Sequence, residues 1–128
     1  MIFEGLRWII GKGVLAYEKM TAPEAPVYSM EQRAAIDAQT QGLALYEFKA
    51  CPFCMKVRHA MRRLGLNIEL RDARRNPAWG DELRENGGKY QTPCLKITTG
   101  DGQVEWLYES EDIIAWLEEN IIIGGEQA

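Results

Sequence analysis

The spacing of hydrophobic residues changes near residue 42, and this change divides the chain into parts. Residues 1–20 carry apolar side chains at helical spacing with polar ones between them, which predicts an amphipathic helix. Residues 31–38 predict a second, short helix, and prolines between the two helices mark a linker. We therefore expect an N-terminal helical extension with a proline-containing linker at residues 1–41, a compact domain at 42–122 and a C-terminal tail at 123–128.

Within the compact domain, alternating and β-branched runs take turns with helical ones. Strands are predicted at residues 43–48, 67–71, 94–98 and 103–108. Helices are predicted at residues 52–64, at 77–85, and from a cap at Ser110 to an end before the glycines at 124–125. The helix between the first two strands implies a parallel crossover, and the glycine-rich turn between the last two implies an antiparallel hairpin. The pattern predicts an α/β fold with a four-stranded mixed sheet.

Two cysteines stand where the first predicted strand gives way to a helix. In the run Ala-Cys-Pro-Phe-Cys, Pro52 suits the first helical position, because no ladder bond needs its missing N–H. Cys51 would then lie at the positive end of the helix dipole, which we expect to bring its pKa from about 8.5 to about 7–8. Lys49 and the Cys54 thiol could lower it further. Cys54, one turn on, could resolve a mixed disulfide formed at Cys51.

Two other interpretations of these cysteines stay open. Both could be small buried hydrophobes, or they could form half of a zinc site. A tetrahedral zinc site needs four ligands, whereas the chain has three cysteines and one histidine, and His59 would lie on the same helix as Cys54. The redox pair is the favoured interpretation because this motif directly follows a strand.

Bulk properties narrow the class of protein. The 128 residues allow one domain of modest core, and the net charge of −4 gives no case for nucleic acid binding. Three cysteines are too few for a disulfide-stapled secreted scaffold, so we expect a cytoplasmic protein, monomeric or weakly dimeric. The helix at residues 1–20 is too short and interrupted to span a bilayer. It could lie at a membrane surface, or pack on the domain or on a second copy of the chain.

The order of elements, with Cys-Pro-x-Cys after the first strand and Thr92-Pro93 before the third, resembles a glutaredoxin of the thioredoxin-fold superfamily. The resemblance covers residues 42–122 and implies a thioredoxin-like fold (β-α-β-α-β-β-α) and glutathione as co-substrate. Residues 107–113 are similar to the same stretch of the glutathione S-transferase N-terminal domain, which shares the fold and binds the same tripeptide. The resemblance further implies that Thr92-Pro93 is a cis peptide bond.

The resemblance also assigns roles to single residues. Cys51 matches the nucleophile and Cys54 the resolving cysteine of the redox-active disulfide. The residues that the resemblance places around glutathione are Lys49, Phe53, Thr92, Pro93, Ser110 and Glu111, or Glu109 with Ser110 in the transferase pattern, and Lys89 is a weak candidate for the glycine carboxylate. Cys94 follows the expected cis-proline and is either a further redox partner or, as we favour, a core residue. His59 is expected to face outward or to cap a helix.

These residues favour a glutathione-dependent thiol–disulfide oxidoreductase that reduces protein disulfides or glutathione mixed disulfides. An alternative of another class is a module that carries a [2Fe–2S] cluster between two chains, with Cys51 of each chain and two glutathione thiols as ligands. Pro52 disfavours that alternative, and no other metal site is expected. A third interpretation is an isolated transferase-like domain, which would lack the helical domain that normally binds the electrophile.

Overall fold

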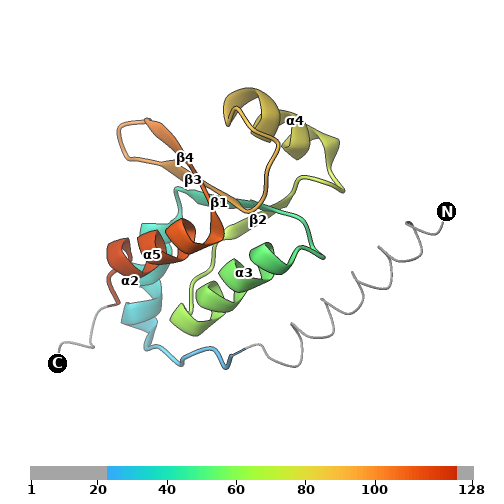
Figure 1. Ribbon diagram of the computed structural model, residues 1–128. Coiled ribbons are helices and arrows are strands. Elements are labelled where there is room, and N and C mark those ends of the chain that lie inside the picture. The colour runs from blue at the N-terminus through green and yellow to red at the C-terminus, as the bar shows by residue number, and fades with distance from the viewer. Residues whose placement is uncertain (1–22, 124–128) are drawn as a thin grey trace.

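The computed structural model describes residues 23–123, so the helix predicted at residues 1–20 and most of the tail lie outside the described residues (Figure 1). The described part holds four helices and four strands. They are α2 (Met30–Thr40), β1 (Leu43–Glu47), α3 (Pro52–Leu64), β2 (Glu69–Asp72), α4 (Pro77–Asn86), β3 (Cys94–Thr98), β4 (Val104–Tyr108) and α5 (Ser110–Asn120).

The four strands form one mixed sheet in the order β2-β1-β3-β4. β1 and β2 are parallel, with Leu45 opposite Leu70. β1 and β3 are antiparallel, as are β3 and β4, with Leu95 opposite both Leu45 and Leu107. The predicted crossover and hairpin are therefore both present. Together with the helices, this sheet confirms the predicted thioredoxin-like fold.

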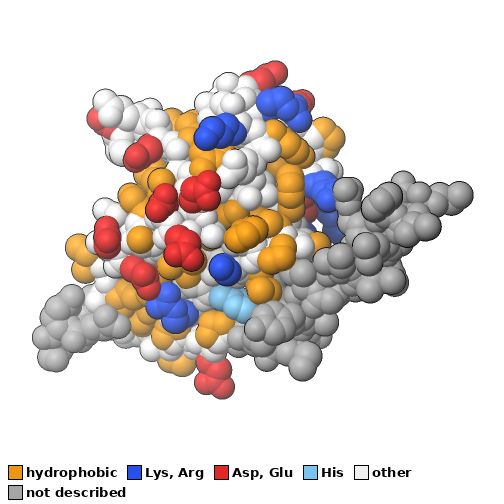
Figure 2. Space-filling view, viewed as in Figure 1, with side chains coloured by type: hydrophobic (Ala, Val, Ile, Leu, Met, Phe, Trp, Pro, Cys, Tyr) orange, Lys and Arg blue, Asp and Glu red, His pale blue; other side chains and the backbone are white. Residues whose placement is uncertain are grey.

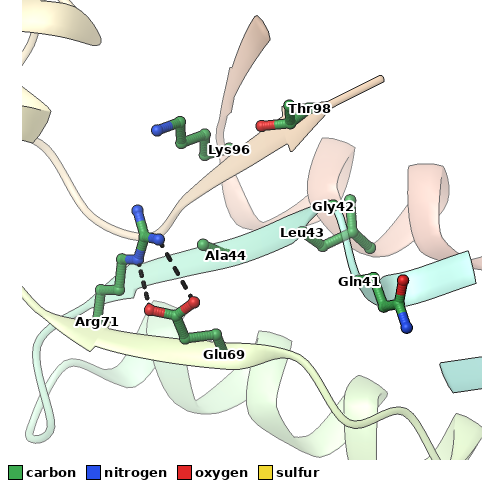
Figure 3. Close-up of a pocket in the computed structure, with 8 residues that line it drawn as sticks. All are labelled: Gln41, Gly42, Leu43, Ala44, Glu69, Arg71, Lys96 and Thr98. Carbon is green, nitrogen blue, oxygen red and sulfur yellow. Dashed lines mark hydrogen bonds and ion pairs between the residues drawn. The ribbon is translucent and has the colours of Figure 1, made fainter. Parts of the chain in front are cut away.

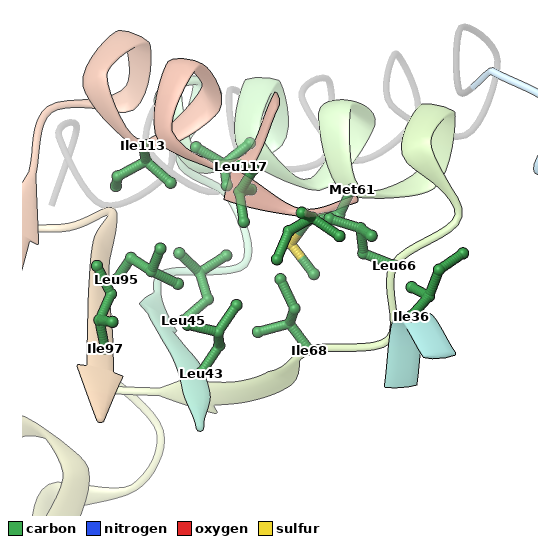
Figure 4. Packing of buried hydrophobic residues seen from close by; sticks show 12 residues of the cluster. Ile36, Leu43, Leu45, Met61, Leu66, Ile68, Leu95, Ile97, Ile113 and Leu117 are labelled. Atoms are coloured by element: carbon green, nitrogen blue, oxygen red, sulfur yellow. The ribbon is translucent and has the colours of Figure 1, made fainter. Parts of the chain in front are cut away.

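The helices cover the two faces of the sheet unequally. α3 and α5 lie side by side on one face, with α2 near them, whereas α4 lies on the other (Figure 1). Alternate residues of β1 serve the two faces, because side chains alternate along a strand. Leu43 and Leu45 join the larger hydrophobic cluster below α3 and α5, which Figure 4 shows. Ala44 and Tyr46 join a smaller cluster on the α4 side.

Helix α2 closes one end of the larger cluster, although the sequence placed it in the extension. Ser29 and Gln32 form a capping box at its start, with both reciprocal hydrogen bonds present. Ile36 is completely buried in the larger cluster. Gln39 forms a pair of hydrogen bonds with the backbone of Ile122, at 2.7 and 2.8 Å, so the helix is also joined to the chain after α5.

The start of α5 corrects one prediction. The N-cap is Glu109 and not Ser110, because Glu109 has a left-handed backbone (φ 72°) while its carbonyl accepts the N–H of Ile113. The helix ends at Asn120, before the glycines, as predicted. Ile121 adopts an extended backbone instead, and its side chain is buried in the larger cluster. Burial of this side chain thus takes precedence over another turn of helix.

Candidate functional site

Cys51 and Cys54 lie together at the start of α3, as the sequence predicts. Cys51 is the N-cap and partly exposed, Pro52 begins the helix, and Cys54 is completely buried. Both thiols are free of disulfide bonds. The N–H of Cys51 donates to the carbonyl of Phe48 at 3.2 Å, and the carbonyl of Cys51 accepts the first helical bond from Met55 at 3.0 Å. Cys51 is therefore held between the end of β1 and the first turn of α3.

The surroundings of Cys51 lower its pKa to about 6. The largest cause is a hydrogen bond from the thiol of Cys54, and partial burial opposes it. Smaller contributions come from the backbone N–H groups of Cys54 and Phe53 at the start of the helix and from the charge of Arg58. With this pKa, roughly nine-tenths of Cys51 is thiolate at pH 7. The helix start alone predicts a weaker effect, because it leaves out the thiol donor and the arginine.

The pKa of Cys54 shifts in the opposite direction, far above its usual value. The hydrogen bond to the Cys51 sulfur is the first cause and burial the second. The backbone of Phe48 and the hydroxyl of Thr92 also bond to the Cys54 sulfur and reduce this increase. One sulfur is thus anionic and its neighbour protonated at neutral pH, which is the arrangement that a nucleophile and a resolving thiol need.

Thr92 and Pro93 approach the same helix start from the loop before β3. Their peptide bond is cis, which confirms the prediction. Thr92 reaches the buried sulfur of Cys54 with its hydroxyl. In the same loop, the amide of Gln91 donates to the carboxylate of Glu109 at 3.2 Å, which ties the loop to the start of α5.

The start of α5 supplies the residues predicted for the γ-glutamyl end of glutathione. Ser110 is buried as the first helical residue, and Glu111 is exposed one position later. The first helical bond runs from Ile113 to Glu109, so the N–H groups of residues 110–112 precede the helical ladder. Figure 2 shows acidic side chains gathered over α5 on this face of the molecule. The site therefore combines backbone donors with nearby carboxylates.

Three further candidates lie at the surface. Phe53 is 57% exposed, with the Lys56 ammonium 5.5 Å from its ring. Lys49 is half exposed, and its ammonium lies 3.7 Å from the carboxylate of Glu47. Lys89 places its ammonium over the ring of Tyr108, at 5.5 Å. Phe53 and Lys49 each lie two residues from Cys51 in the sequence.

Sequence reasoning missed a charged pair beside Cys51. Glu47, at the end of β1, is completely buried and accepts a hydrogen bond from Arg58 of α3 at 2.6 Å. Arg58 also donates to the carbonyl of Lys49 at 2.9 Å. The available signal was an acidic residue at the end of an otherwise apolar strand, because a buried carboxylate needs a partner.

Cys94 and His59 differ from the site residues in their surroundings. Cys94 is fully buried in the smaller cluster on the α4 side, where its thiol contacts the hydroxyl of Tyr108 and burial raises its pKa to about 11. This fits the favoured interpretation as a core residue. His59, expected to face outward, is half-buried, and its Nε2 has no hydrogen-bond partner among the described residues.

A separate cavity of about 230 Å³ lies on the β2, β1 and β3 strands, away from the cysteines (Figure 3). Ala44 forms its floor, and Arg71 and Lys96 extend over it from the flanking strands. Arg71 is already paired with Glu69 at 2.7 Å. The cavity includes none of the predicted site residues.

Two kinds of feature are absent from residues 23–123. In this range, no group of three or more His, Cys, Asp and Glu side chains is arranged to hold a metal ion. Within the same range, no helix has both the length and the apolar character needed to cross a bilayer.

Comparison with known proteins shows the family to which the domain with this site belongs. A family model described as glutathione S-transferase, N-terminal domain, matches residues 45–121. The matched region runs from β1 to the end of α5 and contains both cysteines of the motif, the cis-proline and Ser110. A comparison with curated proteins gave no match.

Proposed function

Because the chain belongs to the family of glutathione S-transferase N-terminal domains, we propose that it is a glutathione-dependent thiol–disulfide oxidoreductase of the glutaredoxin type. The observation that carries the proposal is the pair of sulfurs at the start of α3. Cys51 is a thiolate at neutral pH, and Cys54 is a protonated thiol that donates a hydrogen bond to it. The family supports glutathione as the co-substrate, and the thiol pair supports exchange as the reaction.

In the first step, the Cys51 thiolate attacks the glutathionyl sulfur of a mixed disulfide on a target protein. A bond forms between the two sulfurs as the target's S–S bond breaks, and the target leaves as a thiolate that takes a proton from water. The low pKa of Cys51 supports this step, because only the thiolate is nucleophilic.

The adduct can be released by two routes. In the monothiol route, a glutathione thiolate attacks the glutathionyl sulfur on Cys51, which yields glutathione disulfide and restores the Cys51 thiolate. In the dithiol route, Cys54 loses its proton to water and attacks the Cys51 sulfur, which forms the Cys51–Cys54 disulfide as the bond to the glutathionyl sulfur breaks and glutathione leaves as a thiolate. Two glutathione molecules then supply the two electrons that reduce it. The charge on Cys51 is gone in the adduct, so the main cause of the raised Cys54 pKa disappears when Cys54 must ionise.

The residues around the thiols suggest how glutathione docks. The N–H groups at the start of α5 and the Ser110 hydroxyl suit the γ-glutamyl carboxylate, because helix N-termini attract anions. Glu111 or Glu109 can take the ammonium of the same unit. The backbone of Thr92, before cis-Pro93, offers donors and acceptors to the cysteinyl unit. Lys49 can approach the glycine carboxylate, and the exposed ring of Phe53 forms a wall beside Cys51.

The first prediction tests this reaction with single cysteine variants. We expect Cys51→Ser to lose at least about a hundredfold in reduction of a glutathionylated peptide by glutathione, because the hydroxyl is not ionised at neutral pH. Cys54→Ser should keep the activity within about tenfold, since the monothiol route needs only Cys51. Cys94→Ser, which changes the third cysteine away from the motif, is the matched control and should react like the wild type. An inactive Cys54→Ser protein, or an active Cys51→Ser protein, would refute the proposal.

A further inference from the structure

The buried charge of Glu47 has no part in the steps above, although it lies four residues before the nucleophile. Its side chain is completely removed from solvent. Arg58 donates to one carboxylate oxygen at 2.6 Å, and the ammonium of Lys49 lies 3.7 Å from the other. Burying a carboxylate is unfavourable unless such partners compensate it. The position therefore points to a role that an apolar residue could not fill.

The fold explains how this pair forms. Side chains alternate along β1, so Glu47 is directed to the same face as Leu43 and Leu45, which is the face that α3 covers. Arg58 lies on α3 and is only 11% exposed. Helical side chains lean toward the N-terminus of their helix, so Arg58 extends back toward the start of α3.

A second hydrogen bond of Arg58 connects the pair to the segment that carries Cys51. One nitrogen of the guanidinium bonds Glu47, and the other donates to the carbonyl of Lys49 at 2.9 Å. Lys49 precedes Cys51 by two residues. The planar guanidinium can serve both acceptors at once because its donors point in fixed directions. A full positive charge thus lies against the segment between β1 and the thiolate.

We infer that Arg58 is a positioning residue for the reaction of Cys51: anchored by Glu47, it fixes the segment at residues 48–50 and holds a positive charge beside the N-terminal edge of α3. The inference rests on the proposed function, in which Cys51 is the nucleophile. The charge of Arg58 lowers the pKa of Cys51, in addition to the larger effect of the Cys54 thiol. Glu47 of β1 and Lys49 of the segment after it are charged groups of the same cluster, since Glu47 pairs with Arg58 at 2.6 Å and lies 3.7 Å from the ammonium of Lys49.

The second prediction measures alkylation of Cys51 by iodoacetamide in the full chain from pH 4.5 to 9, read by mass spectrometry at that residue. The wild type should show a midpoint of about 6. Arg58→Met keeps the length of the side chain but removes its charge and donors, and we expect the midpoint to rise by about one pH unit. The rate at pH 6 should then fall about fivefold. At pH 9 the rates of the two proteins should agree within about twofold, because Cys51 is ionised in both of them there.

The matched control is Arg63→Met on the same helix. Arg63 is half exposed and pairs with Glu118 at 2.9 Å, so the substitution removes an arginine and an ion pair away from the sulfur. Its midpoint should equal that of the wild type. Arg58→Lys covers the case in which Arg58→Met does not fold. Lysine keeps the charge but cannot bond both acceptors in the same way, so its midpoint should rise by about half a unit.

A wild-type midpoint in Arg58→Met, or in Arg58→Lys where the first variant does not fold, would overturn the role of Arg58. This result is independent of the proposed function, because alkylation needs no glutathione. If the midpoint rises but the wild type cannot reduce a glutathionylated peptide, the positioning role stands and the proposed reaction falls. If the peptide is reduced and the midpoint does not move, the reverse holds.

Discussion

At the scale of single residues, the buried carboxylate of Glu47 depends on its positively charged partners for stability. Its carboxylate is completely buried against Arg58. The third prediction is that Glu47→Gln lowers the free energy of unfolding by about 3 kcal/mol, because a buried arginine loses its counter-charge. Glu118→Gln breaks the ion pair with Arg63, in which the glutamate is 46% exposed, and should change stability by less than about 1 kcal/mol. Urea unfolding of both variants measures the difference, and equal effects would contradict it.

The sequence predicts some site residues and not others, depending on how local their relation is. The Cys-Pro-x-Cys run and Thr92-Pro93 are short motifs, so their placement follows from the chain around them. Glu47 and Arg58 are eleven residues apart, on a strand and a helix, and their contact depends on how α3 packs on the sheet. For the same reason the sequence predicts the effects of the helix start and of the Cys54 thiol on the Cys51 pKa, but not that of Arg58. The helix start and the thiol belong to one short motif, whereas the place of the arginine depends on its contact with Glu47.

At the scale of elements, sequence periodicity predicts the interior of each helix and strand better than its ends. Helix α3 has the predicted bounds, because Pro52 marks its start and Gly65 its end. The start of α5 differs, because the left-handed backbone of Glu109 shifts the cap by one residue. Its end agrees with the prediction, but the exact residue depends on tertiary packing, since Ile121 leaves the helix to enter the larger cluster. Both features depend on contacts that no local pattern records.

Gly65 offers a test of how the end of α3 is joined to the segment before α2. Its backbone is left-handed (φ 71°), and an added methyl group would lie 2.5 Å from the ring of Tyr28. Tyr28 is itself bonded through its hydroxyl to the carbonyl of Leu64 at 2.7 Å. The fourth prediction is that Gly65→Ala lowers the free energy of unfolding by more than about 2 kcal/mol, since the collision adds to a backbone cost of about 1–2 kcal/mol.

Gly88→Ala is the control that separates these two costs. Gly88 is also left-handed (φ 88°), but among residues 23–123, its own chain neighbours aside, no atom lies within 4 Å of the added methyl group. This variant should show only the backbone cost of about 1–2 kcal/mol. Thermal unfolding compares the two proteins. If Gly65→Ala and Gly88→Ala lowered the free energy of unfolding equally, the collision of the added methyl group with Tyr28 would contribute nothing to the cost.

At the scale of the whole molecule, the order of strands and helices was predictable, because a crossover helix and a tight hairpin restrict how four strands can pair. The role of α2 was not. Its helical core at residues 31–38 is a local signal and was predicted, although the helix extends further, from Met30 to Thr40. Whether its apolar side faces solvent or the core depends on the space that α3 and α5 leave, which the sequence does not state. In the structure, the side chain of Ile36 packs into that space as part of the larger cluster.

The fifth prediction follows from this burial. Ile36 has no exposed surface and belongs to the same cluster as Leu45 of the central strand. We expect Ile36→Ala to lower the free energy of unfolding by about 2–5 kcal/mol, as removal of a buried aliphatic side chain does, and Leu45→Ala to cost a similar amount. Met30 lies on the same helix but is 89% exposed, so Met30→Ala should change stability by less than about 0.5 kcal/mol.

Urea unfolding, followed both by tryptophan fluorescence and by circular dichroism, distinguishes two roles for α2. If α2 belongs to the cooperative unit, both signals should report one transition, and Ile36→Ala should move its midpoint as far as Leu45→Ala does. If α2 were an independent extension, Ile36→Ala would leave the main transition in place. The completely buried Ile36 and the hydrogen bonds between Gln39 and Ile122 support the first outcome, because unfolding α2 alone would expose the end of the larger cluster.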